Sequence, residues 1–413
     1  MSQRTIVVLG GGVGGLVVAN DLRRRLPDHH RVVLVEKNPE HAFAPSFLWL
    51  MTGDRKPEKI TRPLHTLVRD GVQIINAEVV RIDIPHRSIA TSTETLTFDY
   101  LVIALGADLA PETVPGLVEI AHSFYTLAGA KQLQRELAGF TGGKIALVVS
   151  SLPYKCPGAP HEGAMLVADY LDRSGIRDKV DIDLYTPETQ PMPVAGPQVG
   201  DAVKQMLDST GVAFHPLHKL VSVNPQTREI NFEGKAPVPF DLLIAIPPHR
   251  APSVVRDAGL TNESGWIPVD RFTLKTRDEN VYAIGDIAAL SILGRWKPEV
   301  PMMLPKAGVF AHDQAQIVAE RITGEIRGLT PRAEFCGAGY CMLEAGEGLA
   351  GFAFGDFFGE PSPRLQLRQI GRVWHFGKVL FERWWLSPFG MRRAMLRHII
   401  NIGSRLLKIP VKA

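Results

Sequence analysis

The stretch Thr5-Ile6-Val7-Val8-Leu9-Gly10-Gly11-Gly12-Val13-Gly14-Gly15 decides the fold of this chain. An apolar run rich in β-branched residues leads directly into a G-x-G-x-x-G turn, and a helical pattern follows to Leu26. The next apolar run, 32–35, ends in Glu36. Strand, glycine turn, helix, second strand and terminal acid together form the βαβ unit that binds dinucleotides.

The glycines and the acid of this unit have separate physical roles. Gly10 allows the tight turn, Gly12 lets the backbone approach a pyrophosphate, and Gly15 lets the helix pack closely on the strand. The free N–H groups at the helix N-terminus attract phosphate. Glu36 is placed to accept hydrogen bonds from ribose hydroxyls. We therefore predict that an ADP moiety binds at this unit.

Length and composition limit the class of protein. The chain has 413 residues, of which 45% are hydrophobic, so it has material for about two or three globular domains. The formal net charge of +3 argues neither for nor against binding to nucleic acid. We predict no nucleic-acid partner. No apolar stretch approaches the length of a membrane span, and the N-terminal apolar run is interpreted as a strand, not an export signal. Three cysteines do not make a disulfide scaffold, so pairing is expected only for redox work, and no metal site is predicted.

The strand, helix, strand pattern recurs along the chain, which is typical of parallel sheets covered by helices on both faces. We predict an α/β fold with two Rossmann-like lobes. The first takes residues 1–110 and 265–329, because the segment 280–286 returns to it, and the second takes residues 111–264. Residues 330–413 are predicted to form a C-terminal region of shorter strands, aromatic residues and a basic helix.

Several motifs together point to a known family. They are Gly10 to Gly15 with Glu36, the strand 100–106, Cys156-Pro157-Gly158-Ala159-Pro160-His161-Glu162, the segment 281–286, Pro305-Lys306-Ala307-Gly308-Val309-Phe310, and Gly339-Tyr340-Cys341. Over nearly its whole length the chain resembles the sulfide:quinone oxidoreductases, which belong to the two-dinucleotide-domain flavoproteins related to glutathione reductase. The resemblance implies that Gly10, Gly12 and Gly15 bind the FAD pyrophosphate.

The same resemblance implies further contacts to FAD. Asp286 is expected to bind the ribityl chain, and Lys306, with the N-terminus of a helix over 307–323, to stabilise the reduced flavin. The alternatives are that Asp286 caps a helix starting at residues 287–290 and that Lys306 is a plain surface lysine. No cysteine lies upstream of Cys156, so FAD is expected to be non-covalent.

The second lobe lacks a glycine-rich turn after its first strand. That place is occupied by Ser150-Ser151-Leu152-Pro153-Tyr154-Lys155-Cys156-Pro157-Gly158. Tyr154 and Lys155 would obstruct a pyrophosphate, and the prolines remove backbone donors that such a loop needs. We therefore predict that this lobe keeps the fold and does not bind a nicotinamide.

The resemblance implies that Cys156 and Cys341 form a redox pair. Sulfide attacks the oxidised pair to give a persulfide, and the electrons pass to the flavin. Glu162 is expected to exchange protons with the cysteines, the alternative being a charge that the helix dipole stabilises. Without the motif, both cysteines would be interpreted as inert core residues. Cys336 has no assigned partner, and His161 is expected in an exposed turn.

The C-terminal segment 391–408 is predicted to form a basic amphipathic helix. Its apolar face is Met395, Ile399, Ile402 and Leu406, and its polar face is Arg393, Arg397, Ser404, Arg405 and Lys408. With Trp384 and Trp385 nearby, such a helix suits the surface of an anionic bilayer, whereas the alternative is a helix packed on the protein. The resemblance implies that aromatic residues at 352–358 and 381–386 line a quinone pocket, and the alternative is that Phe352, Phe354 and Phe357 form the core face of a strand.

The sequence therefore predicts an enzyme that oxidises sulfide to polysulfide or sulfur and reduces a membrane quinone. It is predicted to be peripheral to the inner cell membrane, on a side that is not determined, and a homo-oligomer is left open. One alternative is an NAD(P)H:quinone oxidoreductase, which the second loop disfavours. Another is the flavin subunit of a sulfide dehydrogenase that docks a cytochrome, which the C-terminal helix and the lack of an export signal disfavour.

Overall fold

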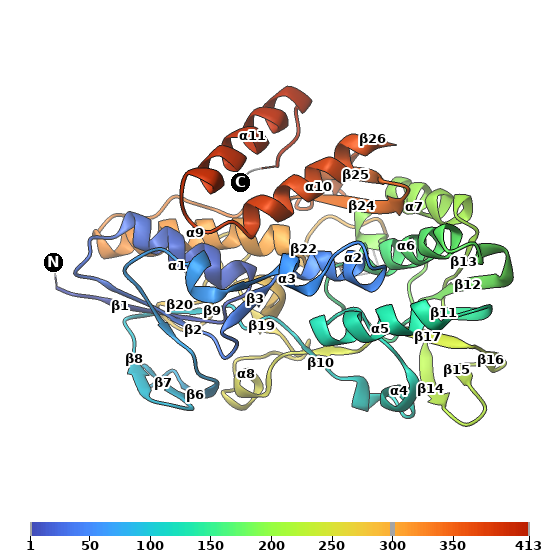
Figure 1. Cartoon of the computed structure of the whole chain (residues 1–413). Coiled ribbons are helices and arrows are strands. Elements are labelled where there is room, and N and C mark those ends of the chain that lie inside the picture. The colour runs from blue at the N-terminus through green and yellow to red at the C-terminus, as the bar shows by residue number, and fades with distance from the viewer. Residues whose placement is uncertain (1, 298–301, 412–413) are drawn as a thin grey trace.

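Two parallel sheets lie side by side in the computed structural model, which describes residues 2–297 and 302–411 (Figure 1). The first sheet has the strand order β20-β9-β1-β2-β5. Its strands are β1 (Thr5–Leu9), β2 (Arg31–Val35), β5 (Val72–Ile75), β9 (Tyr100–Ile103) and β20 (Val281–Ala283). The segment at β20 thus rejoins the first sheet after the chain has built the second one.

Two long helices cover one face of the first sheet. α1 (Val13–Arg25) follows β1, and α9 (Gly308–Ile326) packs against α1 although it comes late in the chain. The strands β1 and β2 are buried on both faces, as the continuous apolar runs predict. The carboxyl ends of these strands and the N-termini of both helices therefore meet at one edge of the lobe.

The second sheet repeats this plan with the order β13-β12-β11-β17. Its strands are β11 (Gly143–Val149), β12 (Val180–Tyr185), β13 (Val212–His215) and β17 (Leu242–Ile246), and its helices are α5 (Leu127–Gly139), α6 (Ala159–Arg173) and α7 (Pro197–Ser209). The α/β class is confirmed by these two sheets. The residue limits of the two lobes stay a prediction.

The C-terminal region forms a third layer that contacts both lobes. It consists of the antiparallel strands β24 (Ala338–Gly346), β25 (Leu349–Asp356) and β26 (Arg364–Gly371), followed by α10 (Arg372–Trp385) and α11 (Met391–Leu407). The expectation of shorter strands is wrong, because each of these is longer than any strand of the parallel sheets. β24 packs on α6, and α11 lies on the outside of the molecule (Figure 1).

Short elements fill the connections. In the first half they are β3 (Glu40–Ala42), α2 (Phe47–Met51), α3 (Pro57–Ile60), β4 (Thr61–Pro63), β6 (Val79–Asp83), β7 (Ser88–Thr91), β8 (Thr95–Thr97), β10 (Asp108–Leu109) and α4 (Leu117–Ile120). In the second half they are β14 (Leu220–Asn224), β15 (Glu229–Phe232), β16 (Val238–Pro239), β18 (His249–Arg250), α8 (Ser253–Asp257), β19 (Ile267–Pro268), β21 (Ala288–Ala289), β22 (Ser291–Ile292) and β23 (Met302–Met303). Of the helices within residues 2–297 and 302–411, none combines the length and apolarity that crossing a bilayer requires.

Candidate functional site

The glycine-rich loop between β1 and α1 can be built only from glycine at two positions. Gly10 has a φ of +99°, and a Cβ there would lie 2.4 Å from the carbonyl oxygen of Ala104. A Cβ on Gly15 would lie 1.7 Å from the carbonyl oxygen of Gly10. The helix and the turn therefore touch at their backbones, which no other residue type permits.

The outer side of this loop fits a pyrophosphate group. Gly12 is exposed, and a Cβ on it would meet nothing within 4 Å. It caps α1 without a side-chain hydrogen bond, so the first N–H groups of the helix stay free for an anion. The Glu36 carboxylate accepts a 2.6 Å hydrogen bond from the Gly11 N–H, which aims it at the loop. Open space, free donors and an oriented acid are what the ADP part of FAD needs.

The corresponding loop of the second lobe is longer, and the side chain of Tyr154 is buried within it. Residues 150–158 separate β11 from α6, whereas only residues 10–12 separate β1 from α1. Tyr154 is buried in this loop, and its hydroxyl donates a 3.0 Å hydrogen bond to Oε2 of Glu188, beyond the end of β12. Burial raises the pKa of Glu188 to about 7, although the hydrogen bonds from Tyr154 and Thr186 oppose this. The acid that follows the second strand is thus bound by the protein's own tyrosine.

The two site cysteines lie at one place. Cys156 lies in the second loop with a φ of +58°, and its N–H donates a 2.6 Å hydrogen bond to the Lys306 carbonyl. A Cβ on Gly158 would lie 3.4 Å from Sγ of Cys341, which β24 carries to this loop. Both cysteines also pack against the same apolar core. Cys336, in contrast, is exposed.

Burial and a nearby carboxylate hold both thiols in the neutral form. Burial, with the charge of Glu162, raises the pKa of Cys156 to about 12. The same two causes raise the pKa of Cys341 above its ordinary value. Lys378 opposes the rise at both sulfurs. A group that removes protons is therefore needed if either thiol is to react as a thiolate.

Glu162 lies in the first turn of α6, only 2% exposed, and forms an ion pair with Lys378 of α10. Its Oε1 also accepts a 2.9 Å hydrogen bond from the Glu344 N–H. Burial acts against the charge of Lys378, but Glu162 and Glu344 outweigh it, so the pKa of this lysine is raised and it stays protonated. The sequence interpretation missed Lys378. The sequence feature that could have indicated Lys378 is that it is a single charged residue in the otherwise uncharged run 373–381.

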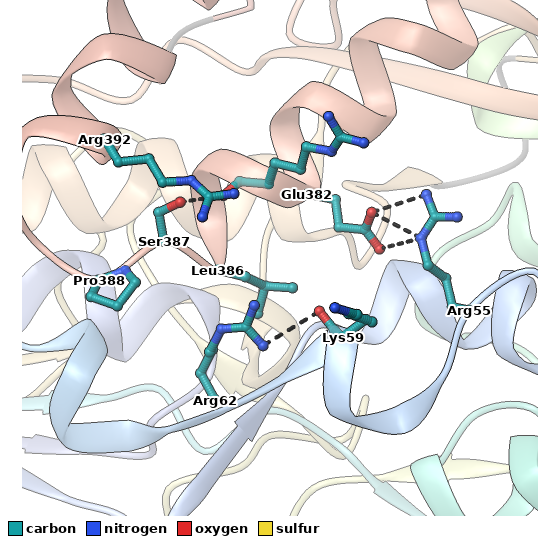
Figure 2. Close-up of a pocket in the computed structure, with 9 residues that line it drawn as sticks. Arg55, Lys59, Arg62, Glu382, Leu386, Ser387, Pro388 and Arg392 are labelled. Atoms are coloured by element: carbon teal, nitrogen blue, oxygen red, sulfur yellow. Dashed lines mark hydrogen bonds and ion pairs between the residues drawn. The ribbon is translucent and has the colours of Figure 1, made fainter.

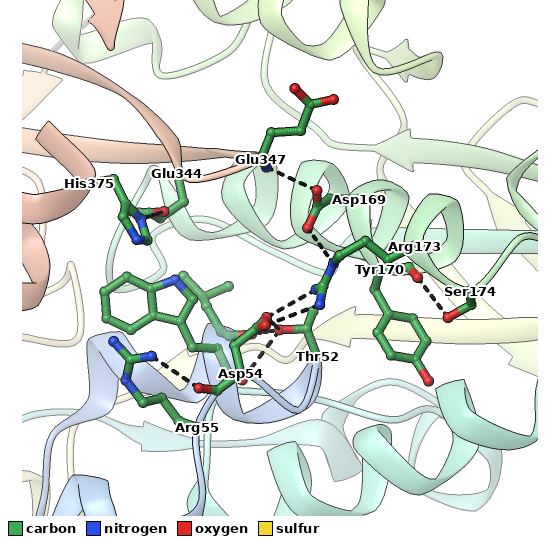
Figure 3. Close-up of polar contacts among 12 residues, drawn as sticks. Thr52, Asp54, Arg55, Asp169, Tyr170, Arg173, Ser174, Glu344, Glu347 and His375 are labelled. Carbon is green, nitrogen blue, oxygen red and sulfur yellow. Dashed lines mark hydrogen bonds and ion pairs between the residues drawn. The ribbon is translucent and has the colours of Figure 1, made fainter. Parts of the chain in front are cut away.

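Glu344, a second carboxylate, links the buried pair Glu162–Lys378 to a residue near the surface. Glu344 Oε2 lies 2.7 Å from Nδ1 of His375, which is partly exposed (Figure 3). Figure 3 also shows Arg173 of α6 paired with Asp169 of the same helix and with Asp54, and the Asp54 pair ties α6 to the segment after α2. His161, predicted in an exposed turn, is fully buried in α6, and that prediction is wrong. The first turns of α6 are covered by the C-terminal sheet, which the local sequence does not reveal.

Lys306 and Asp286 lie together beneath the Cys156 loop. The Lys306 ammonium donates to the carbonyl oxygens of Asp286 and Ala288 and lies 3.5 Å from the ring centroid of Trp266. Burial lowers the pKa of Lys306 to about 8, so the surface-lysine alternative is wrong. The capping alternative for Asp286 is wrong as well, because a single 3-10 turn, Gly285–Ile287, is followed by the strand β21 and not by a helix.

The exposed side of α11 carries an apolar stripe beside the exposed basic residues Arg392, Arg397 and Arg405. Met391, Met395, Ile399, Ile402, Leu406 and Leu407 are all exposed. Leu396, Ile400 and Ser404 are buried on the opposite side, so placing Ser404 on the polar face was wrong. The helix thus both packs on the protein and leaves an apolar stripe uncovered in the chain described here.

The aromatic residues before α11 are largely core residues. Trp384 and Trp385 are buried, and Trp385 Nε1 donates a 2.8 Å hydrogen bond to Nε2 of His41 in the first lobe. Their expected position at a lipid surface is therefore wrong. Phe352 of β25 stacks on Trp374 with ring centroids 4.7 Å apart, which confirms the core-face alternative for Phe352, whereas Phe354 of the same strand is partly exposed. Phe357 is buried as well, but it lies in the turn after β25 and not on a strand.

The chain is similar in sequence and in fold to proteins named for sulfide and quinone. The chain is 30% identical over 298 residues to a mitochondrial sulfide:quinone oxidoreductase of Mus musculus, an alignment that covers 69% of this chain and 66% of the relative. It is 27% identical over 393 residues to a sulfide-quinone reductase of Aquifex aeolicus, covering 92% and 90% of the two chains. The X-ray structure of the sulfide:quinone oxidoreductase from Aquifex aeolicus matches with a TM-score of 0.85 and 26% identity over 99% of this chain and 96% of that one.

A family model described as pyridine nucleotide-disulphide oxidoreductase matches residues 4–315, which include both parallel sheets. The glycine-rich loop and Glu36 lie inside this match. FAD is the cofactor of this family, and the loop fits its ADP part. The chain therefore belongs to the pyridine nucleotide-disulphide oxidoreductase family.

Proposed function

We propose that this protein is a sulfide:quinone oxidoreductase, an enzyme that oxidises sulfide at Cys156 and Cys341 and reduces a quinone. One observation carries the proposal. Cys341 of β24 lies against Gly158 of the Cys156 loop, and Cys156 is hydrogen-bonded to Lys306 of the first lobe. Two thiols from distant segments thus meet at the junction between the second lobe, the C-terminal sheet and the flavin lobe. The similarity to proteins named for this activity supports the same conclusion.

The overall reaction balances as HS⁻ plus quinone plus H⁺ giving sulfane sulfur plus quinol. In the oxidised pair, HS⁻ attacks one sulfur, the Cys156–Cys341 bond breaks, a persulfide S–S bond forms, and the other cysteine leaves as a thiolate. FAD held by the glycine-rich loop and Asp286 would supply two-electron transfer between the cysteine site and the quinone. The proton released from the persulfide passes to Glu162, and Lys378 stabilises the negative charge that each thiolate carries.

The nucleotide loop supports FAD held without a covalent bond. Gly10, Gly12 and Gly15 would hold the pyrophosphate, Glu36 the ribose and Asp286 the ribityl chain. Residues 1–110 and 265–329 form the proposed FAD domain, and 111–264 a second domain without nicotinamide. The filled loop with Tyr154 argues against the NAD(P)H:quinone oxidoreductase alternative.

The exposed stripe of α11 supports a peripheral position on a membrane, with residues 330–413 facing lipid and quinone. The helix would lie along the surface, because its other side packs on the protein through Leu396 and Ile400.

Replacing either cysteine with serine tests the proposal. Serine keeps the side chain small but forms neither a disulfide nor a persulfide, so Cys156→Ser and Cys341→Ser should each lower sulfide-dependent quinone reduction by orders of magnitude. Cys336→Ser is the matched control and should keep most of the activity, because Cys336 is exposed and away from the pair. Steady-state rates are compared at equal flavin content. Near-normal turnover in either of the first two variants would remove the redox pair from the mechanism.

A further inference from the structure

A basic cavity of about 550 Å³ lies between the first lobe and the C-terminal helices (Figure 2). Its volume is within the range of pockets that hold organic ligands, about 300–1000 Å³. The residues around it are Arg55, Lys59, Arg62, Glu382, Arg383, Leu386, Ser387, Pro388 and Arg392. It shares none of these residues with the glycine-rich loop or the cysteine site.

The charge of the cavity wall is unbalanced. Five basic side chains face one acid, Glu382, which accepts hydrogen bonds from Ser46 and Arg55. Within residues 2–297 and 302–411, no ion pair joins a carboxylate to the other four cations, Lys59, Arg62, Arg383 and Arg392. Figure 2 shows these cations on both walls, Lys59 and Arg62 on one side and Arg392 on the other. Clustered like charges without counter-charge are costly, so this wall suits an anion with several acceptor oxygens.

The surroundings of the cavity favour an amphiphilic anion. Arg392 lines the cavity, and its neighbour Met391, which is 91% exposed, begins the apolar stripe of α11. Met395 continues the stripe one turn further along the helix. A free phosphate ion would use the basic wall alone and leave the stripe in water. A phospholipid would place its phosphate in the cavity and its acyl chains along the stripe.

We infer that this cavity binds the phosphate headgroup of an anionic phospholipid. The inference rests on the proposed peripheral position on a membrane and adds to it a defined headgroup site. Binding there would fix α11 and the loop before it, residues 386–390, at the lipid surface. Arginine supplies paired donors to phosphate oxygens, and lysine adds a point charge.

Vesicle binding by the flavin-loaded full chain tests the inference. Sedimentation is measured with phosphatidylcholine vesicles alone and with vesicles that also contain phosphatidylglycerol. Wild-type protein should prefer the second kind. In the variant Lys59→Gln/Arg392→Gln the apparent affinity for these should fall by about a hundredfold or more, since the loss of charge-assisted hydrogen bonds to the phosphate adds to the severalfold electrostatic effect of each basic residue. Both side chains are exposed, so flavin content should not change.

The matched control removes the same charge from α11 outside the cavity. Arg397→Gln/Arg405→Gln should lose about tenfold or less, because these exposed residues attract the surface only through general electrostatics, which salt screens. Equal losses in the two double variants would overturn the headgroup site, as would a wild-type protein without preference for phosphatidylglycerol.

Two further experiments complete the test. The first distinguishes a lipid headgroup from free phosphate, and the second distinguishes failure of the headgroup site from failure of the proposed function. Inorganic phosphate without vesicles should show no saturable binding to wild-type protein by calorimetry. Saturable phosphate binding that Lys59→Gln/Arg392→Gln abolishes, with vesicle binding unchanged in that variant, would mean that the cavity takes free phosphate instead of lipid. Sulfide-dependent reduction of a soluble short-chain quinone needs no vesicle. Its absence in wild-type protein would refute the proposed function, whereas a lack of lipid preference alongside normal turnover would refute only the headgroup site.

Discussion

The loop after β1 and the loop after β11 occupy equivalent places and have opposite properties. Each follows the first strand of a parallel sheet and leads into a helix that packs on that sheet. The first is three glycines long, 10–12, with open space outside Gly12. The second, 150–158, holds a buried Tyr154 and the backbone-strained Cys156. The same frame therefore presents backbone donors in one lobe and a thiol in the other.

The acids behind the two loops repeat this contrast. Glu36 follows β2 and accepts from the backbone of the glycine loop, so its carboxylate borders the open nucleotide space. Glu188 lies beyond β12 and accepts from Tyr154 and Thr186. In Rossmann-like sheets this edge is the usual ligand-binding position. In the second lobe Tyr154 and Glu188 fill it, and the loop that carries Cys156 lies there.

The largest effect is expected from a single methyl group in the first turn of α1, next to the first loop. In Gly15→Ala, the new Cβ would overlap the Gly10 carbonyl at 1.7 Å, so helix and turn cannot close and flavin should be absent from the purified protein. Absorbance of the released flavin per chain measures this. Gly12→Ala is the matched control, since its Cβ meets no protein atom and the fold should persist. A yellow, fully loaded Gly15→Ala protein would contradict the close contact.

A smaller effect is expected at the second loop when Glu162 loses its charge. Glu162→Gln removes the carboxylate that helps to raise the pKa of Cys156 to about 12, whereas Lys378, which lowers that pKa, keeps the nearby charge of Glu344. The thiolate fraction at neutral pH rises about tenfold for each unit by which the pKa falls. Alkylation by iodoacetamide should therefore be faster than in the parent. Both proteins carry Cys336→Ser, so that the exposed thiol does not contribute, and equal rates would show that Glu162 does not control the thiols.

The smallest effect concerns the acid of the closed loop. Burial raises the pKa of Glu188 from 4.5 to about 7. The protonated acid is favoured in the folded chain, so its contribution to stability is complete below pH about 4.5 and is lost as the pH rises to about 7. In Glu188→Gln the thermal unfolding midpoint should fall less over this window than in wild type. Parallel pH profiles for the two proteins would mean that Glu188 titrates as a solvated acid.

Sequence patterns over short stretches predicted the helices, strands and turns whose formation depends on residues close together in the chain. The run 5–15 with Glu36 indicates the first βαβ unit because strand, glycine turn and helix follow one another directly. The helix at 391–408 was equally predictable, and it ends at Leu407. Its exposed stripe followed from the helical period, which fixes which residues share a face.

Contacts between distant segments were not predictable in the same way. Lys378 reaches Glu162 only because α10 packs behind β24, and no local signal links these residues. His161 and Trp385 were assigned to the surface because helix amphipathicity does not show what a later layer will cover. The basic cavity also needs two separate segments, one with Lys59 and Arg62 and one with Arg392.

The central claim is that electrons enter through Cys156 of the second loop and Cys341 of β24, and not through a nicotinamide. Anaerobic mixing tests it most directly: the purified protein is mixed with sulfide and then with a short-chain quinone, and separately with NADH, while the flavin absorbance is followed. Sulfide should bleach the flavin, quinone should restore it, and NADH should leave it nearly unchanged. Rapid bleaching by micromolar NADH, with no response to sulfide, would contradict the account.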